Sequence, residues 1–138
     1  MPEGAPVAIR GSAPSGPGYW YPPTVLCPVA RHDRAAAEEI FGPVAVVLPF
    51  RDEDEAVALA NDTIYGLSGS IWARDGAKAL RVARAIETGV LSINSNTSVR
   101  VGTPFGGFKQ SGVGRELGPH ALDAYTEVKS VFYATGGA

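Results

Sequence analysis

Residues 38–44 carry the residue types best suited to chemistry in this chain, because an acid and an aromatic ring stand two positions apart. Glu39 can accept two hydrogen bonds from a ribose diol, and hydrogen bonds to an ionised acceptor are the stronger kind. Phe41 can cover one face of a flat heterocycle by apolar contact. Gly42 and Pro43 follow at once and end the segment. The same spacing also fits a solvated surface acid followed by a core side chain.

A second candidate is the glycine-rich passage at residues 103–118, in which Phe105 and Phe108 interleave with the glycines. Glycines at this density let the backbone turn tightly and approach another surface closely. A dinucleotide-phosphate fingerprint does not fit, because its third glycine falls one place late, at Gly118, and no strand leads into Gly112. The passage therefore predicts a tight loop that packs against a neighbouring domain.

Cys27 is the only thiol of the chain, and it lies within a short apolar run that predicts a strand. We therefore expect a buried, inert side chain, with a hydrolase built on Cys27 and His32 as the alternative. Neither His32 nor His120 has metal-ligand spacing with the other or with the cysteine. The acids at 52–55 are explained by capping of a helix start, so we expect no metal site.

Composition excludes several classes of function. The chain has 138 residues, which suits one domain, and its 12 basic and 14 acidic residues nearly cancel. Such a charge balance argues against binding to nucleic acid or to a membrane surface. No apolar stretch approaches the roughly 20 residues of a membrane span, and no signal sequence opens the chain, so we expect a cytoplasmic protein.

Strand and helix patterns alternate along the middle of the chain, which predicts an α/β fold with a largely parallel sheet and helices packed on it. We expect a Pro/Gly-rich arm (1–18), a main domain (19–126) and a terminal strand with its tail (127–138). Strands are expected at 7–9, 24–29, 44–50, 90–94 and 127–132, and residues 66–73 are expected to form a turn and then a strand. Helices are expected at 34–40, 53–60, 75–89 and 119–125.

Three finer expectations concern these elements. The strand at 44–50 is almost continuously apolar and so predicts burial on both faces. The third helix should begin after a capping Asp75, place Leu80, Ala83 and Ile86 on one face, and stop at a left-handed Gly89. The final strand alternates polar and apolar residues, as a half-exposed strand does.

Five sequence blocks occur together in an order that identifies a family. They are residues 23–26, 38–44, 61–67, 88–94 and 104–112. With these blocks the chain, from about Val7 onward, resembles the C-terminal part of an NAD(P)-dependent aldehyde dehydrogenase. The resemblance implies a partial aldehyde dehydrogenase catalytic domain with a C-terminal oligomerisation strand.

The resemblance also implies roles for particular residues. Glu39 matches the glutamate that binds the nicotinamide-ribose hydroxyls, and Phe41 matches the ring on the nicotinamide side. Phe105 resembles an aromatic residue that lines the aldehyde tunnel. Val99 stands where some relatives place an aromatic ring, so we expect room for a bulkier or more polar aldehyde. The segment from Glu127 to Phe132 resembles one that joins a sheet across subunits, which implies a homo-oligomer.

The departures from the family concern catalysis. The family places its cofactor fold, general-base glutamate and catalytic cysteine before this region, and Cys27 lacks the glycine-rich context of that cysteine. We therefore assign no catalytic residue here and expect a truncated family protein that is not catalytic alone, with weak or absent binding of NAD or NADP. The alternatives are an oligomeric interaction module, or one half of a split dehydrogenase whose partner chain supplies the missing domains.

Overall fold

The structure is a computed structural model that describes residues 5–136. It divides into two compact units, with the boundary between Thr63 and Ile64, and each is described by itself. The expected boundaries of the arm, the main domain and the tail are not tested by this division and stay predictions. In the part of the chain that is described, no helix has the length and apolar character needed to cross a membrane.

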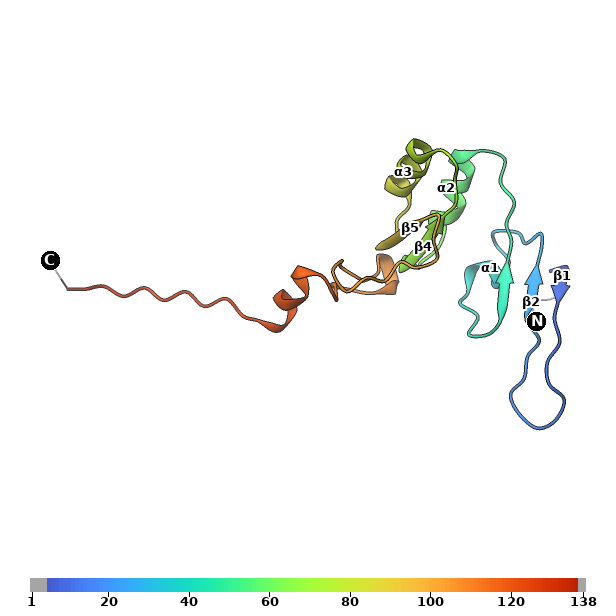
Figure 1. Ribbon diagram of the computed structural model, residues 1–138, viewed down its shortest axis with the longest axis horizontal. Helices are drawn as coiled ribbons and strands as arrows, with labels where there is room; N and C mark the ends of the chain where they lie inside the picture. Colours follow the sequence, from blue (N-terminus) through green and yellow to red (C-terminus); the bar gives the residue numbers. More distant parts are fainter. Residues whose placement is uncertain (1–4, 137–138) are drawn as a thin grey trace. The chain divides into compact units, whose positions relative to one another are not determined.

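The first unit is built on a three-stranded sheet with the strand order β1-β2-β3 (Figure 1). Strand β1 pairs with β2 antiparallel, and β2 pairs with β3 in parallel. The core lies under β2, where Leu26 and Val29 pack with Ala35 of the first helix. The elements are β1 (Val7–Arg10), β2 (Thr24–Leu26), α1 (Arg34–Ala37), β3 (Val44–Val46) and α2 (Glu53–Asn61).

The expected long, fully buried third strand is wrong. Only Val44–Val46 form β3, and burial alternates along it, with Ala45 exposed between two half-buried valines. Apolar residues continue to Phe50, but that ring is exposed. A continuous apolar run does not distinguish a strand covered on two faces from one covered on a single face, because that depends on which elements pack there.

The start of α2 follows the expected capping pattern with one change. The Asp52 carboxylate accepts a hydrogen bond from the Glu55 amide at 2.9 Å. The Glu55 carboxylate accepts hydrogen bonds from the Arg51 amide at 2.7 Å and from the Arg51 guanidinium at 2.9 Å, rather than from the amide of the cap residue itself. The acid therefore closes the first turn and pairs with a cation on the residue before the cap.

The second unit contains a separate parallel pair, so the expected single sheet is replaced by two small sheets, one mixed and one parallel (Figure 1). Strands β4 and β5 are in register from Ser68 opposite Val90 to Ile71 opposite Ile93. The elements are β4 (Ser68–Ile71), α3 (Gly76–Ala85), β5 (Val90–Ile93) and two 3₁₀ helices, η1 (Lys109–Ser111) and η2 (Pro119–Tyr125). A helix over 119–125 is confirmed, in this tighter form.

Helix α3 confirms its predicted cap and two of the three residues of its predicted face. Asp75 accepts hydrogen bonds from the amides of Ala77 at 2.9 Å and Lys78 at 3.3 Å. The fully buried residue is Ala79, whereas Leu80 is 52% exposed. Ala83 and Ile86 are half-buried, so Ala79 takes the place expected of Leu80 on this face, and a small side chain lies at the closest contact.

Gly89 does not adopt the left-handed conformation that we expected, because α3 has already ended at Ala85. Its role is close approach instead: a Cβ on Gly89 would overlap the carbonyl oxygen of Gly106. Gly66 has a similar role, since a Cβ there would lie 2.6 Å from the carbonyl oxygen of Glu87. These two glycines let the glycine-rich loop lie against the starts of β4 and β5.

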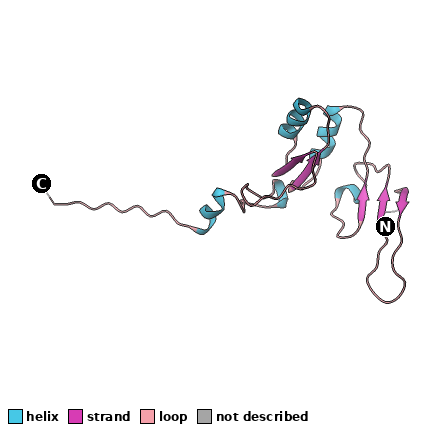
Figure 2. Ribbon diagram, in the orientation of Figure 1, coloured by secondary structure: helices cyan, strands magenta, loops and turns pink. Residues whose placement is uncertain are grey.

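The C-terminal segment from Glu127 to Phe132 is extended and joins no strand of the described chain (Figure 2). Val128 is 100% exposed and Phe132 is 91% exposed, so neither face of the segment is covered. The expected half-exposed strand is therefore absent from the described chain taken alone. Pairing with a second copy of the chain stays a prediction.

We expect Gly89→Ala to lower the free energy of unfolding by about 2 kcal/mol, because the new methyl group would displace the backbone at Gly106. The matched control is Gly76→Ala, since nothing lies within 4 Å of a Cβ at that position. Alanine at this first residue of α3 should stabilise by about 0.5 kcal/mol. Urea unfolding followed by circular dichroism measures both, and equal effects of the two variants would contradict the close-approach role.

Candidate functional site

The site begins where α1 ends. Asp33 precedes the helix and accepts a hydrogen bond from the Ala30 amide at 2.9 Å. The amide of Glu38 makes the last helical bond, to the Arg34 carbonyl at 2.8 Å, while Glu38 itself already has an extended backbone. From this residue onward successive side chains point to opposite sides, as they do in a strand.

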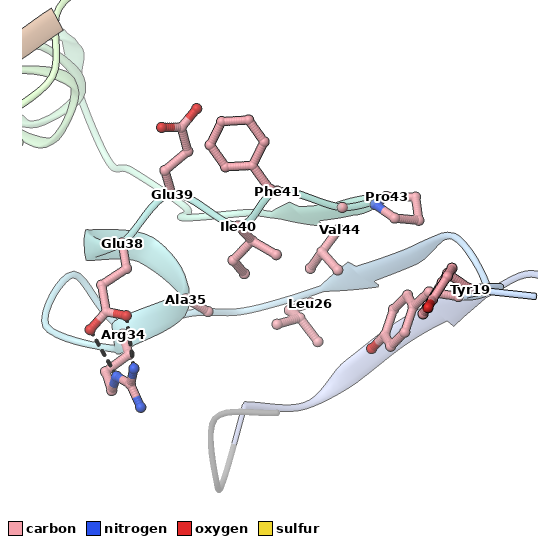
Figure 3. Close-up of a pocket in the computed structure, with 12 residues that line it drawn as sticks. Tyr19, Leu26, Arg34, Ala35, Glu38, Glu39, Ile40, Phe41, Pro43 and Val44 are labelled. Carbon is pink, nitrogen blue, oxygen red and sulfur yellow. Dashed lines mark hydrogen bonds and ion pairs between the residues drawn. The ribbon is translucent and has the colours of Figure 1, made fainter.

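This change of backbone places Glu39 and Phe41 on one side. Figure 3 shows their side chains next to each other, while Ile40 and Val44 point the opposite way, toward Leu26. Phe41 is 94% exposed, so the alternative in which this ring is a core side chain is wrong. The result is an exposed carboxylate beside an exposed aromatic face.

The two adjacent acids have different environments. The Arg34 guanidinium donates two parallel hydrogen bonds to Glu38, from Nε to Oε1 and from Nη2 to Oε2, each at 2.8 Å. These hydrogen bonds hold the pKa of Glu38 below its usual value of 4.5. Within residues 5–136 no side chain or amide forms a hydrogen bond or ion pair with the Glu39 carboxylate. Glu39 is therefore the acid whose oxygens remain available to a ligand.

A hollow of about 490 Å³ lies behind this exposed face. In Figure 3, Tyr19 lies at one end of it and the Arg34–Glu38 pair at the other. The side chains of Glu39 and Phe41 point away from the apolar floor, so these two residues contribute only to its rim. The lining residues are Tyr19, Tyr21, Leu26, Arg34, Ala35, Glu38, Glu39, Ile40, Phe41, Gly42, Pro43 and Val44.

The glycine-rich loop is closed by its own backbone. Phe105 and Glu116 exchange two amide–carbonyl hydrogen bonds of 2.7 Å each. The Arg115 guanidinium donates to the carbonyls of Gly107 at 3.1 Å and Gly114 at 2.6 Å. It also lies 5.4 Å from the centre of the Phe108 ring. A guanidinium bound to two carbonyls and an aromatic face holds the loop in one shape.

This loop docks within its own unit. The Gly66 carbonyl accepts hydrogen bonds from the amides of Gly89 at 3.0 Å and Phe108 at 2.8 Å. The Gly66 amide donates to the Ser111 hydroxyl at 2.9 Å. The passage is thus a packing loop, as its sequence predicted, although its contacts are with the starts of β4 and β5. Phe105 and Val99 both belong to this unit, with Phe105 half-buried and Val99 exposed.

Cys27 is half-buried rather than buried, and its amide donates to the Pro6 carbonyl at 3.0 Å. His32 is exposed, and the described residues show no hydrogen bond between the two side chains. No cluster of three or more potential metal ligands occurs within residues 5–136. The structure therefore offers no support for a Cys27–His32 hydrolase.

The sequence analysis did not predict the Arg34–Glu38 ion pair, which distinguishes Glu38 from its neighbour Glu39. Arg34 and Glu38 stand four residues apart, which is the spacing at which oppositely charged side chains meet on a helix, so a local signal existed. The loop-closing role of Arg115 had no such signal, because its carbonyl partner at Gly107 lies eight residues away along an irregular backbone.

Comparison with known proteins places this geometry in a family. Residues 1–131 match the model of the aldehyde dehydrogenase family. The succinate-semialdehyde dehydrogenase [NADP(+)] of Deinococcus radiodurans is 49% identical over 94% of this chain, and an aldehyde dehydrogenase of Emericella nidulans is 44% identical over 98%. In each case the match covers 27% of the relative.

Solved structures agree. The structure of a Mycobacterium tuberculosis aldehyde dehydrogenase complexed with NAD+ superposes with a TM-score of 0.88 at 41% identity, over 99% of this chain and 28% of that one. The chain belongs to the aldehyde dehydrogenase family, and it spans about a quarter of the length of the relatives that it matches.

The Arg34–Glu38 pair makes a pH-dependent prediction. The pKa of Glu38 is lowered in the folded state, so the stability that the ion pair contributes is complete above pH 4.5. That stability is lost as the pH falls through the lower pKa of the folded state. Carbon-13 NMR of the Glu38 carboxyl should give a titration midpoint below 4.5, and Arg34→Gln should raise it. Equal midpoints in the two proteins would rule out the pairing in solution.

Proposed function

We propose that this chain is the C-terminal portion of an NAD(P)-dependent aldehyde dehydrogenase, whose reaction oxidises aldehydes to carboxylic acids. Family membership and the order of the five sequence blocks support the placement. One observation carries the role of the site: Glu39 and Phe41 share an exposed face, and the Glu39 carboxylate is unpaired while Glu38 is held by Arg34.

The proposed role of this face is to hold the nicotinamide half of the cofactor. A carboxylate with free lone pairs can accept one hydrogen bond from each hydroxyl of a ribose diol. The exposed Phe41 ring, two residues away, can lie against the nicotinamide ring. The bound cofactor would supply the hydride acceptor, and these two residues would orient it.

The proposed aldehyde-lining residues are Phe105 and Val99. Phe105 is fixed through its backbone bridge to Glu116, so its ring is presented from a closed loop. Val99 is smaller than an aromatic ring and is 52% exposed, which leaves space beside it for a substrate. Their position relative to the cofactor face is part of the proposal.

Attack on an aldehyde carbon requires an activated nucleophile and a base, held together in one geometry. We assign neither role to any of these 138 residues, since Cys27 has no basic partner in the described chain. The chain is therefore proposed to supply the cofactor and substrate walls, with weak cofactor affinity and no turnover by these residues alone. A cytoplasmic location and the choice between NAD and NADP stay predictions.

We further propose that the segment from Glu127 to Phe132 pairs with a second copy of the chain. An extended segment with uncovered backbone groups and apolar side chains is a ready edge for strand addition. Val128, Val131 and Phe132 are all largely exposed in the chain taken alone. Pairing across a twofold axis would cover them in both copies at once.

Titration of the 138-residue chain with NAD+ and with NADP+ tests the cofactor face. Glu39→Gln should weaken binding about tenfold, because it removes the charge from a hydrogen-bond acceptor. Glu38→Gln is the matched control, an adjacent acid already committed to Arg34, and should change affinity less than twofold. Equal losses of affinity in both variants would contradict the role of Glu39. Reduction of NAD(P) by this chain in the presence of a panel of aldehydes would contradict the absence of a nucleophile.

Light scattering tests the edge strand. We expect an oligomer, and we expect Val131→Pro to yield a monomer, because proline removes an amide that the inter-chain ladder needs. Thr135→Pro, beyond the segment, is the control and should leave the mass unchanged. A monomeric parent protein, or an oligomer that persists in Val131→Pro, would exclude this segment as the interface.

A further inference from the structure

The loop that follows β5 carries a cation without an acidic partner. The Arg100 guanidinium donates a long hydrogen bond of 3.5 Å from Nη1 to the carbonyl of its neighbour Val99. Within residues 5–136 no carboxylate forms an ion pair with it. Two other cations of this unit differ, since Lys109 pairs with Glu87 at 2.8 Å and Arg115 binds loop carbonyls.

The backbone around Arg100 is fixed although its side chain is free. The Arg100 carbonyl accepts hydrogen bonds from the Thr103 amide at 3.1 Å and the Thr103 hydroxyl at 3.3 Å, which closes a tight turn. The Gly118 amide donates to the Val101 carbonyl at 3.0 Å. The same loop is bridged at Phe105, two residues beyond the turn. Arg100 and Phe105 are therefore held on one closed frame.

The glycine-rich loop at 103–118 carries one acidic side chain beside one lysine and one arginine. Glu116 is the acid that lies on the loop, and its backbone bridges to Phe105. No ion pair joins Glu116 to Arg100 in the described residues, so the guanidinium keeps its donors for a ligand. Val99, immediately before Arg100, is the smaller side chain that leaves space beside the proposed aldehyde wall.

We propose that Arg100 selects aldehydes that carry a carboxylate a few carbons from the carbonyl group. A guanidinium presents a planar fork of donors that matches the two oxygens of a carboxylate, and it stays charged at every relevant pH. Val99 would leave room for the chain of such a substrate, and Arg100 would bind its charged end. This inference rests on the proposed function, in which Phe105 and Val99 line the aldehyde site.

The first test uses the 138-residue chain and NMR of the arginine side-chain Nε–H groups. Butyrate should shift the Arg100 resonance, and n-butanol, which has the same carbon skeleton without the charge, should not. Arg84 on α3 is the internal control and should not respond to either. Equal shifts at both arginines, or none at Arg100, overturn the proposal.

The second test uses a full-length hybrid in which residues 5–131 replace the matching part of the Deinococcus relative. The quantity measured is the ratio of kcat/KM for succinic semialdehyde to that for butanal. Arg100→Gln should lower this ratio about fivefold to tenfold, consistent with a partly exposed charge pair, and Arg84→Gln should not. An unchanged ratio in Arg100→Gln overturns the proposal.

The two tests also separate this inference from the proposed function. A hybrid that oxidises neither aldehyde contradicts the proposed function, and the butyrate titration then decides whether Arg100 binds carboxylates. A hybrid that oxidises butanal well and shows the same charge preference with and without Arg100 supports the proposed function and overturns the role of Arg100.

Discussion

The face proposed to hold the cofactor depends on one feature of the backbone, the end of α1 at Ala37. If the helix continued, Glu39 and Phe41 would lie about 200° apart around its axis, on opposite sides. Because the backbone becomes extended at Glu38, the two side chains instead point the same way and Ile40 points into the unit. The Arg34–Glu38 pair lies at this junction. It keeps the Glu38 carboxylate bound to Arg34, so this acid does not compete with Glu39 for the same ligand.

The second unit depends on a different feature of the backbone, the close approach of chain segments at two glycines. Gly66 and Gly89 lack side chains where two backbones meet, so the loop at 103–118 can hydrogen-bond directly to the backbone before β4 and can approach the start of β5 closely. Arg115 then fixes the loop from within. Phe105, Val99 and Arg100 belong to irregular structure, and this closed loop and the turn before it give them the fixed backbone on which their proposed role in substrate choice relies.

Local signals predicted much of this. The caps at Asp52 and Asp75 and the strands near β1, β2, β4 and β5 follow from short-range patterns. The expected helix at 34–40 is too long, because α1 ends at Ala37, and it is this early end that puts Glu39 and Phe41 on a shared side. The length of β3 and the exposure of Leu80 on α3 did not, because they depend on which elements cover them. Gly89 was misjudged for a related reason: a glycine needed for close approach looks, in sequence, like one needed for a left-handed turn.

The most direct measurement is a nuclear Overhauser experiment between the bound cofactor and the chain. The account predicts contacts from the nicotinamide ring protons to the Phe41 ring, which are lost in Phe41→Ala. Contacts to Tyr19 or Tyr21, from a cofactor lying in the hollow behind that face, would contradict it.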